Sequence, residues 1–111
     1  MSVLIQVLEQ TPTAHTRWEH VKFAFVDWEY VTTLRLDGQC GVWLDGTKHG
    51  ESHRLASTAT PGEAIFFLLT VFDRVAQCRR SGGSWIVGHD GRSVDSIRAT
   101  RFPVRSDDGT A

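Results

Sequence analysis

The adjacent residues His89 and Asp90, within the segment 88–91 (GHDG), are the nearest approach in this sequence to a catalytic pair. A carboxylate that orients an imidazole lets the histidine act as a general base or as a pH-sensitive contact. Asp-Gly, however, is also a residue pair of hairpin turns, and adjacent side chains at the tip of a strand point apart. We therefore expect a turn here, and His89 and Asp90 are the catalytic candidates of an alternative, enzymatic hypothesis.

His49 and His53 are spaced four residues apart, as two zinc ligands on one helix face would be. Gly50 lies between them, and the polar segment 47–52 predicts a loop that leads into a strand. In a loop this spacing does not bring two imidazole rings onto one face. His49 and His53 are the candidates for a metal site, but we expect no bound metal and no cofactor.

Arginine makes up ten of the twelve basic residues, and six arginines lie between Arg79 and Arg105. Together with Trp85, such a group could neutralise and stack against single-stranded nucleic acid. The net charge is nevertheless −1, and Arg98 and Arg101 fall on opposite faces of an ideal strand. Binding of single strands through the C-terminal arginines is therefore a further alternative, and we expect no nucleic-acid partner.

One long helix with both ends marked is predicted for residues 61–80. Thr60 suits the N-cap, Pro61 the first helical position, and Glu63 completes a capping box. At the other end, Arg79 and Arg80 favour the negative pole of the helix dipole, and the segment 81–83 (SGG) can leave helical space.

Apolar residues recur along this helix at a spacing that predicts a wide buried stripe. The stripe is expected to consist of Ile65, Leu68, Leu69, Phe72, Val75 and Ala76, widened by Ala64, Phe67, Val71 and Cys78. Phe66 breaks the pattern, because it falls among the polar residues of the opposite side. We therefore predict that Phe66 is covered by a subunit contact or by a loop of the same chain.

Segments in which β-branched and aromatic residues alternate with polar ones predict six or seven strands. The strands are expected within residues 2–9, 18–36 (two strands that turn near residues 27–29), 40–44, 53–57, 84–88 and 93–102. Asp-Gly pairs at 37–38, 45–46 and 90–91 predict turns. The element order βββββαββ predicts an α+β fold, in which one amphipathic helix packs on one face of a mostly antiparallel, twisted sheet.

A chain of 111 residues with 41% hydrophobic and 23% charged residues is typical of one globular domain. We expect residues 1–102 to form this domain and the polar residues 103–111 to form a flexible C-terminal tail. The N-terminus has no secretory leader, and its apolar run is too short to cross a membrane. These features predict a cytoplasmic protein without a membrane partner, in which Cys40 and Cys78 are reduced.

No motif ties the sequence to a known family, and no set of residues forms a coherent active site. Because aromatic residues are enriched in protein interfaces, we expect a non-enzymatic protein-binding module. It would associate with itself as a homodimer or bind a foreign protein, as inhibitors, immunity-type proteins and accessory proteins of mobile elements do. The expected contact residues are Phe66, Phe67, Trp28, Trp43 and Trp85. The alternative is an enzyme or small-ligand-binding protein with a helix–sheet pocket near His89 and Asp90.

Overall fold

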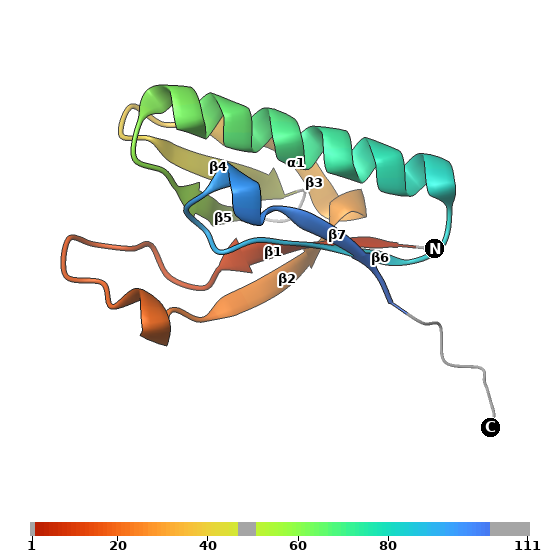
Figure 1. Ribbon diagram of the computed structural model, residues 1–111, viewed down its shortest axis with the longest axis horizontal. Coiled ribbons are helices and arrows are strands. Elements are labelled where there is room, and N and C mark those ends of the chain that lie inside the picture. The colour runs from red at the N-terminus through yellow and green to blue at the C-terminus, as the bar shows by residue number, and fades with distance from the viewer. Residues whose placement is uncertain (1, 47–50, 103–111) are drawn as a thin grey trace.

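The structure, a computed structural model, describes residues 2–46 and 51–102. Within these residues, one α-helix lies across one face of a seven-stranded sheet that is mixed but mostly antiparallel (Figure 1). The strands are β1 (Val3–Leu8), β2 (Phe23–Asp27), β3 (Val31–Leu36), β4 (Gly41–Gly46), β5 (Ser52–Ser57), β6 (Trp85–Gly88) and β7 (Arg98–Arg101). The helices are α1 (Pro61–Ser81) and the short 3-10 turns η1 (Trp18–His20), η2 (Trp28–Tyr30) and η3 (Val94–Ser96). The predicted α+β class and element order are confirmed.

Strand β1 is the centre of the sheet, whose order is β3-β4-β5-β1-β6-β7 with β2 paired to β1 outside this path. β1 runs antiparallel to β2 and parallel to β6, and it meets β5 at a single residue pair. Leu8 pairs both with Phe23 of β2 and with Arg54 of β5. Since a strand has two edges, β5 and β6 share the edge of β1 that faces away from β2. The sheet therefore divides at β1, where β5 pairs near Leu8 and β6 pairs with residues 3–5.

The structure adds detail to two predicted parts of the sheet. The chain turns near residues 27–29 as expected, through η2, but β2 and β3 do not pair with each other, because β2 pairs with β1 and β3 pairs with β4. The hairpin of β6 and β7 is confirmed, although its second strand is shorter than the predicted 93–102. The carboxylate of Asp90 accepts hydrogen bonds from the Arg92 and Ser93 amides, and this holds the first part of that segment in a loop that leads into η3.

Helix α1 begins at Pro61, as predicted, and ends at Ser81, one residue beyond the predicted end. The Thr60 hydroxyl accepts a hydrogen bond from the Glu63 amide at 3.1 Å, and Pro61 occupies the first turn. At the C-terminus, Gly82 has a φ of 73°, a positive value that glycine adopts without steric cost. The core between α1 and the sheet is apolar, and its largest fully buried side chains are those of Phe67, Ile5, Leu44, Leu55, Val7, Val42, Val71, Val75 and Val87.

Within residues 2–46 and 51–102, no helix is both long and apolar enough to span a membrane. The predicted flexible tail, residues 103–111, lies outside the described part of the chain, and so does the candidate metal ligand His49.

Candidate functional site

The apolar arc of helix α1 has a buried part and an exposed part. The inner face is buried against the sheet and consists of Ala64, Phe67, Val71, Val75 and Cys78. The second set, which we call the outer stripe, consists of Ile65, Leu69, Phe72 and Ala76. Residues at this spacing fall within an arc of about 60° at 3.6 residues per turn. The side chains of Ile65, Leu69 and Phe72 are 48%, 56% and 56% exposed, so the outer stripe is an uncovered apolar surface along the helix.

The predicted buried stripe combined residues from both of these faces. Phe67, predicted as a contact residue, is fully buried in the core, so its assignment to an interface is wrong. Ile65, Leu69 and Phe72, predicted to be buried, are exposed instead. The physical reason is that the sheet contacts a narrower arc of the helix than its apolar residues occupy. The sequence does contain a signal for the outer stripe. Its four residues repeat at helical spacing and project in a different direction from the residues of the inner face.

The outer stripe continues into a groove between α1 and strand β3. This α1–β3 groove has a volume of about 370 Å³ and is lined by Trp28, Val31, Thr32, Thr33, Leu34, Leu68, Leu69 and Phe72. The ring of Trp28 lies 6.4 Å from the ring of Phe72, measured between centroids. Strand β3 ends the strand order, so among the described residues no strand covers its far edge. Trp28, one of the predicted contact residues, therefore adjoins the outer stripe.

Phe66 is the most exposed large apolar residue in the described part of the chain, at 67%. It lies beside the outer stripe on α1, on the flank that also carries Asp73. At this exposure, no loop among residues 2–46 and 51–102 covers the ring, so the predicted cover by a loop of the same chain is not seen there. A contact with another subunit, the other predicted explanation, stays a prediction.

Trp43 and Trp85, the other predicted contact residues, do not adjoin the outer stripe. Trp43 lies on the sheet face opposite α1, because its neighbours Val42 and Leu44 are both buried in the core. Trp85 lies at the C-terminal end of α1, where its Nε1 donates a hydrogen bond to the Gly82 carbonyl at 2.8 Å. The structure thus does not bring the predicted aromatic residues into one surface.

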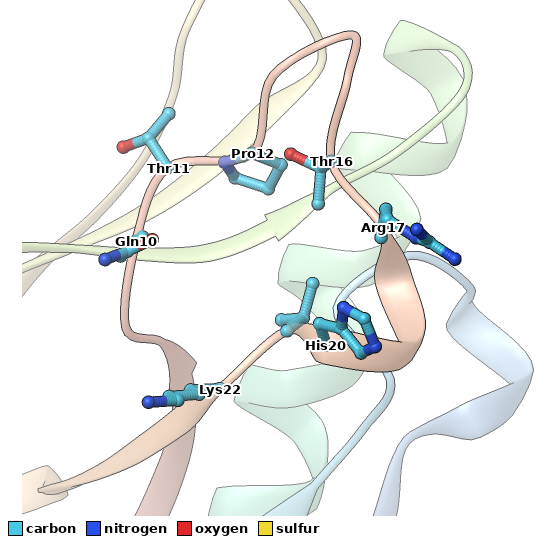
Figure 2. Close-up of a pocket in the computed structure, with 8 residues that line it drawn as sticks. Gln10, Thr11, Pro12, Thr16, Arg17, His20 and Lys22 are labelled. Carbon is cyan, nitrogen blue, oxygen red and sulfur yellow. The ribbon is translucent and has the colours of Figure 1, made fainter.

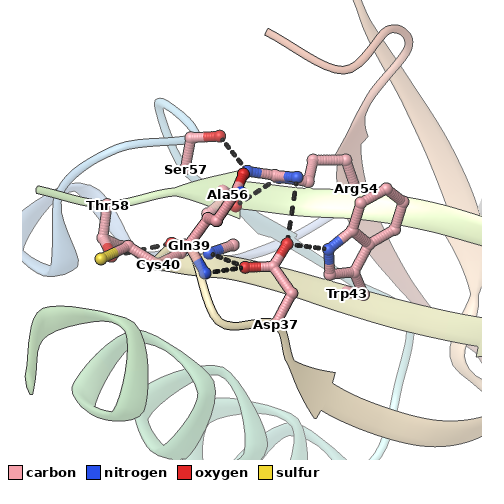
Figure 3. Close-up of polar contacts among 9 residues, drawn as sticks. Asp37, Gln39, Cys40, Trp43, Arg54, Ala56, Ser57 and Thr58 are labelled. Carbon is pink, nitrogen blue, oxygen red and sulfur yellow. Dashed lines mark hydrogen bonds and ion pairs between the residues drawn. The ribbon is translucent and has the colours of Figure 1, made fainter. Parts of the chain in front are cut away.

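Trp43 belongs to a polar cluster that braces the β3–β4 turn (Figure 3). The carboxylate of Asp37 accepts hydrogen bonds from the Trp43 indole at 2.8 Å and from the Gly41 and Gln39 amides at 2.8 and 2.7 Å. Arg54 lies 3.4 Å from the same carboxylate. The hydrogen bond from Trp43, followed by those from Gly41 and Gln39, lowers the pKa of Asp37 to about 2. Because the donors within the chain satisfy this carboxylate, the cluster stabilises the turn and offers no reactive group.

His89 is buried, and both of its ring nitrogens have partners. Nδ1 accepts a hydrogen bond from the Gly91 amide at 2.9 Å, and Nε2 lies 2.6 Å from the Gln6 carbonyl oxygen. Since Nδ1 is an acceptor, the proton is on Nε2, which donates to Gln6. Burial lowers the pKa of His89, although the Gln6 carbonyl opposes this effect. The imidazole also packs edge-on against Phe67, with centroids 5.0 Å apart, so it is a core group.

Asp90 organises the loop that follows β6. Its carboxylate accepts hydrogen bonds from the Arg92 and Ser93 amides at 2.8 Å each and from the Ser96 hydroxyl at 3.0 Å. Burial tends to raise the pKa of Asp90, but the hydrogen bonds from Ser93 and Arg92 outweigh it and lower the pKa. His89 and Asp90 thus have different partners, and neither has the geometry of a base and its orienting group.

The remaining metal candidate, His53, lies beside a single carboxylate. Its Nε2 is 3.4 Å from Oε2 of Glu51. Among the described residues, no group of three potential ligands is placed to hold a metal ion.

A second hollow, of about 400 Å³, is formed by the segment between β1 and β2 (Figure 2). It is lined by Gln10, Thr11, Pro12, Thr16, Arg17, His20, Val21 and Lys22. Its basic groups Arg17, His20 and Lys22 are exposed to solvent, and the Arg17 guanidinium lies 3.6 Å from Glu19. An anion bound there would stay in contact with water and a neighbouring carboxylate, so these basic groups would bind it only weakly.

Arginines cover aromatic rings elsewhere in the fold. Arg92 lies 4.7 Å above the Trp18 ring and Arg101 lies 4.8 Å above the Trp85 ring. Ring faces occupied in this way are not free to stack against nucleic-acid bases. Arg105 lies outside the described residues.

Comparisons of this chain with known protein families, with curated proteins and with solved structures find no match.

Proposed function

We propose that this protein acts by binding another protein through the outer stripe of α1 and the adjoining α1–β3 groove. The observation that carries the proposal is the exposure of Ile65, Leu69 and Phe72 along one face of a helix whose other apolar face already fills the core. Single exposed apolar residues are ordinary, whereas an apolar stripe that continues into a groove is typical of interaction sites.

The energetics favour a partner of protein size. Full burial of a leucine, isoleucine or phenylalanine side chain contributes roughly 1.5–3 kcal/mol, and about half of each side chain on the stripe is still accessible. Covering Ile65, Leu69 and Phe72 therefore contributes a few kcal/mol, on the order of 1 kcal/mol for each residue. Association also costs translational and rotational freedom, so the contact has to extend beyond these residues. Phe66 on one flank and Trp28 in the groove on the other can extend it.

The chemistry of the other candidates supports a non-enzymatic role. His89 and Asp90 are engaged in hydrogen bonds that hold the fold, and the Asp37 carboxylate is held in the same way. The arginine–tryptophan pairs argue against stacking on single-stranded nucleic acid. A protein-binding surface on α1 requires none of these groups, and it accounts for apolar residues that the monomer leaves exposed.

Site-specific photo-crosslinking in the cells that make the protein tests this function. A benzophenone amino acid at Leu69 should give a discrete protein adduct, whereas the same probe at the exposed His15, in the segment between β1 and β2, should give none. Introducing Ile65→Lys beside the probe should abolish the adduct, because a charge in the stripe opposes its burial. Failure of the Leu69 probe to give an adduct, or an adduct that persists with Ile65→Lys, would overturn the proposal.

A further inference from the structure

We infer that the protein partner presents an extended segment, which adds to the sheet as a strand along the free edge of β3 and places apolar side chains in the α1–β3 groove. This inference rests on the proposed function and names the form of the partner. Strand β3 ends the strand order, and among the described residues no strand pairs with its far edge. An open edge of a sheet exposes main-chain N–H and C=O groups, which an added strand can bind.

The pairing of β3 with β4 shows which main-chain groups lie on the free edge. The Asp37 amide donates a hydrogen bond to the Gly41 carbonyl of β4 at 3.1 Å. In an antiparallel pair, residues bound to the neighbouring strand alternate with residues whose main-chain groups face outward. Counting back from Asp37, Arg35 therefore binds β4, whereas Leu34 and Leu36 direct their N–H and C=O groups away from it. The irregularity in this pairing lies nearer the start of β3.

The same two leucines place the free edge beside the groove. Leu34 pairs with Leu44, and Leu36 pairs with Val42. Cross-strand partners project from the same face of a sheet, and both partners are buried in the core under α1. The side chains of Leu34 and Leu36 therefore lie on the α1 side of the sheet, while their main-chain groups point outward within its plane. A strand added to β3 would place one row of its side chains on the α1 side, facing the outer stripe.

A helical partner would suit this edge less well than an extended one. The main-chain groups of a helix bind one another, so a helix laid against β3 would shield the outward groups of Leu34 and Leu36 from water without binding them. Polar groups that are buried without a partner oppose association. An extended segment binds the same groups in the ladder pattern of a sheet, so the free edge favours a strand as the occupant of the groove.

The groove also defines the side chains that the segment carries. Among the described residues that line it, none has a charged side chain. Its β3 side runs from Val31 to Leu34, and three steps of about 3.4 Å span roughly 10 Å. Side chains on one face of a strand are about 6.8 Å apart, so two of them enter the groove. The segment therefore carries two uncharged, apolar side chains that are separated by one residue of any type.

Hydrogen exchange tests the arrangement of the edge. In the free protein, the Leu34 and Leu36 amides should exchange at least about tenfold faster than the Arg35 amide, which is bound to β4. A phage-displayed library of random decapeptides is then selected on the immobilised protein. The selected peptides should share two apolar residues separated by one residue, and a synthetic copy should slow the exchange of the Leu36 amide. Equal exchange of the three amides in the free protein, a library without a binder, or a peptide that leaves the Leu36 amide unchanged would overturn the inference.

The Leu69 photo-crosslink tests strand addition in the cell. Leu36→Pro removes one outward N–H group and breaks no hydrogen bond to β4, because that N–H group faces away from β4. Leu36→Ala is the matched control, since it removes the same side chain but keeps the N–H group. Leu36→Pro should lower the yield of the adduct by about tenfold or more, whereas Leu36→Ala should lower it by less than about threefold. Both variants should keep the circular dichroism spectrum of the wild type.

The results separate this inference from the proposed function. An adduct that Ile65→Lys abolishes but Leu36→Pro leaves intact would keep the protein-binding function and overturn strand addition. The absence of any adduct without these substitutions would overturn both. If Leu36→Pro alters the fold, the exchange rates of the Leu34 and Leu36 amides decide the inference.

Discussion

Phe66 and Phe67 are consecutive in α1, yet the side chain of Phe66 is 67% exposed and that of Phe67 is fully buried. Consecutive residues in a helix project about 100° apart, so one ring points away from the sheet while the other enters the core. Phe67 packs there against the imidazole of His89. Substituting each phenylalanine in turn therefore distinguishes the contribution of a core side chain to stability from that of an exposed one.

Phe67→Ala should lower the free energy of unfolding by about 3–5 kcal/mol, because it leaves a cavity in a closed core. Phe66→Ala should change it by less than about 0.5 kcal/mol when unfolding is measured at a concentration where the protein is monomeric. Urea denaturation followed by circular dichroism gives both values. Similar losses for the two variants would show that the ring of Phe66 is packed within the monomer.

Asp37 should make the stability of the protein depend on pH in the acidic range. Its pKa of about 2 in the folded protein lies below the ordinary value of 3.8, so the ionised form stabilises the fold. This contribution is fully present above the unfolded pKa near 4 and is lost as the pH falls towards 2. A shift of this size corresponds to at most roughly 2.5 kcal/mol, and partial exposure of the carboxylate reduces it.

Asp37→Asn should therefore be less stable than the wild type by about 1–2 kcal/mol at pH 7, and the difference should narrow between pH 4 and pH 2. Urea midpoints measured across this range test the expectation. Asp95→Asn, which removes an exposed carboxylate in η3, provides the comparison. A gap between Asp37→Asn and the wild type that stays constant down to pH 2 would exclude a role for the ionised carboxylate.

His89 should be less protonated at pH 6.5 than an unperturbed imidazole, which is half protonated there, because burial lowers its pKa. The unfolded chain binds this proton more readily than the folded protein does. The neutral His89 therefore stabilises the fold above about pH 6.5, and this contribution is lost as the pH falls through the folded-state pKa. Long-range proton–nitrogen NMR correlations should show the proton on Nε2 and a bare Nδ1. A charged ring at pH 6.5, or a proton on Nδ1, would contradict the hydrogen bonds to Gln6 and Gly91.

The sequence predicts elements well wherever their signals are local. Thr60 and Gly82 bound α1 through interactions that reach no farther than one turn, so the predicted and observed ends agree to within one residue. The class of the fold follows from the order of such elements. The pairing of β1 with β2 and of β3 with β4, which leaves β2 and β3 apart, depends on contacts between distant segments, and local patterns do not encode them.

The surface on α1 illustrates the same limit. Hydrophobic spacing shows that more than one side of the helix is apolar, but it does not show which part of that arc the sheet covers. Phe67, predicted as a contact residue, is therefore buried, and Leu69, predicted to be buried, is exposed. Both belong to regular helical patterns. The Asp37 cluster is likewise out of reach of sequence patterns, because Arg54 lies seventeen residues from the carboxylate that it contacts.

The turn between β3 and β4 holds a conformation that the Asp-Gly pair does not predict. Among the described residues, Cys40 is the non-glycine residue with a positive φ, at 63°, whereas Gly38 is not among the glycines with positive φ. A side chain with a Cβ in the left-handed region is strained by roughly 1 kcal/mol. The Cys40 carbonyl is fixed there because it accepts hydrogen bonds from the Thr58 amide and hydroxyl, each at 3.0 Å.

Cys40→Gly should relieve this strain, since glycine adopts a positive φ without steric cost. The backbone carbonyl that binds Thr58 is kept, but the unfolded chain gains freedom, which offsets part of the benefit. Cys40→Ala is the matched control, because it removes the thiol while keeping the Cβ that causes the strain. We expect Cys40→Gly to be more stable than Cys40→Ala by about 0.5–1 kcal/mol in urea denaturation. An alanine variant as stable as the glycine variant would contradict this expectation. It would mean that the turn relaxes without strain once the thiol is removed, so that the thiol rather than the backbone determines the conformation of residue 40.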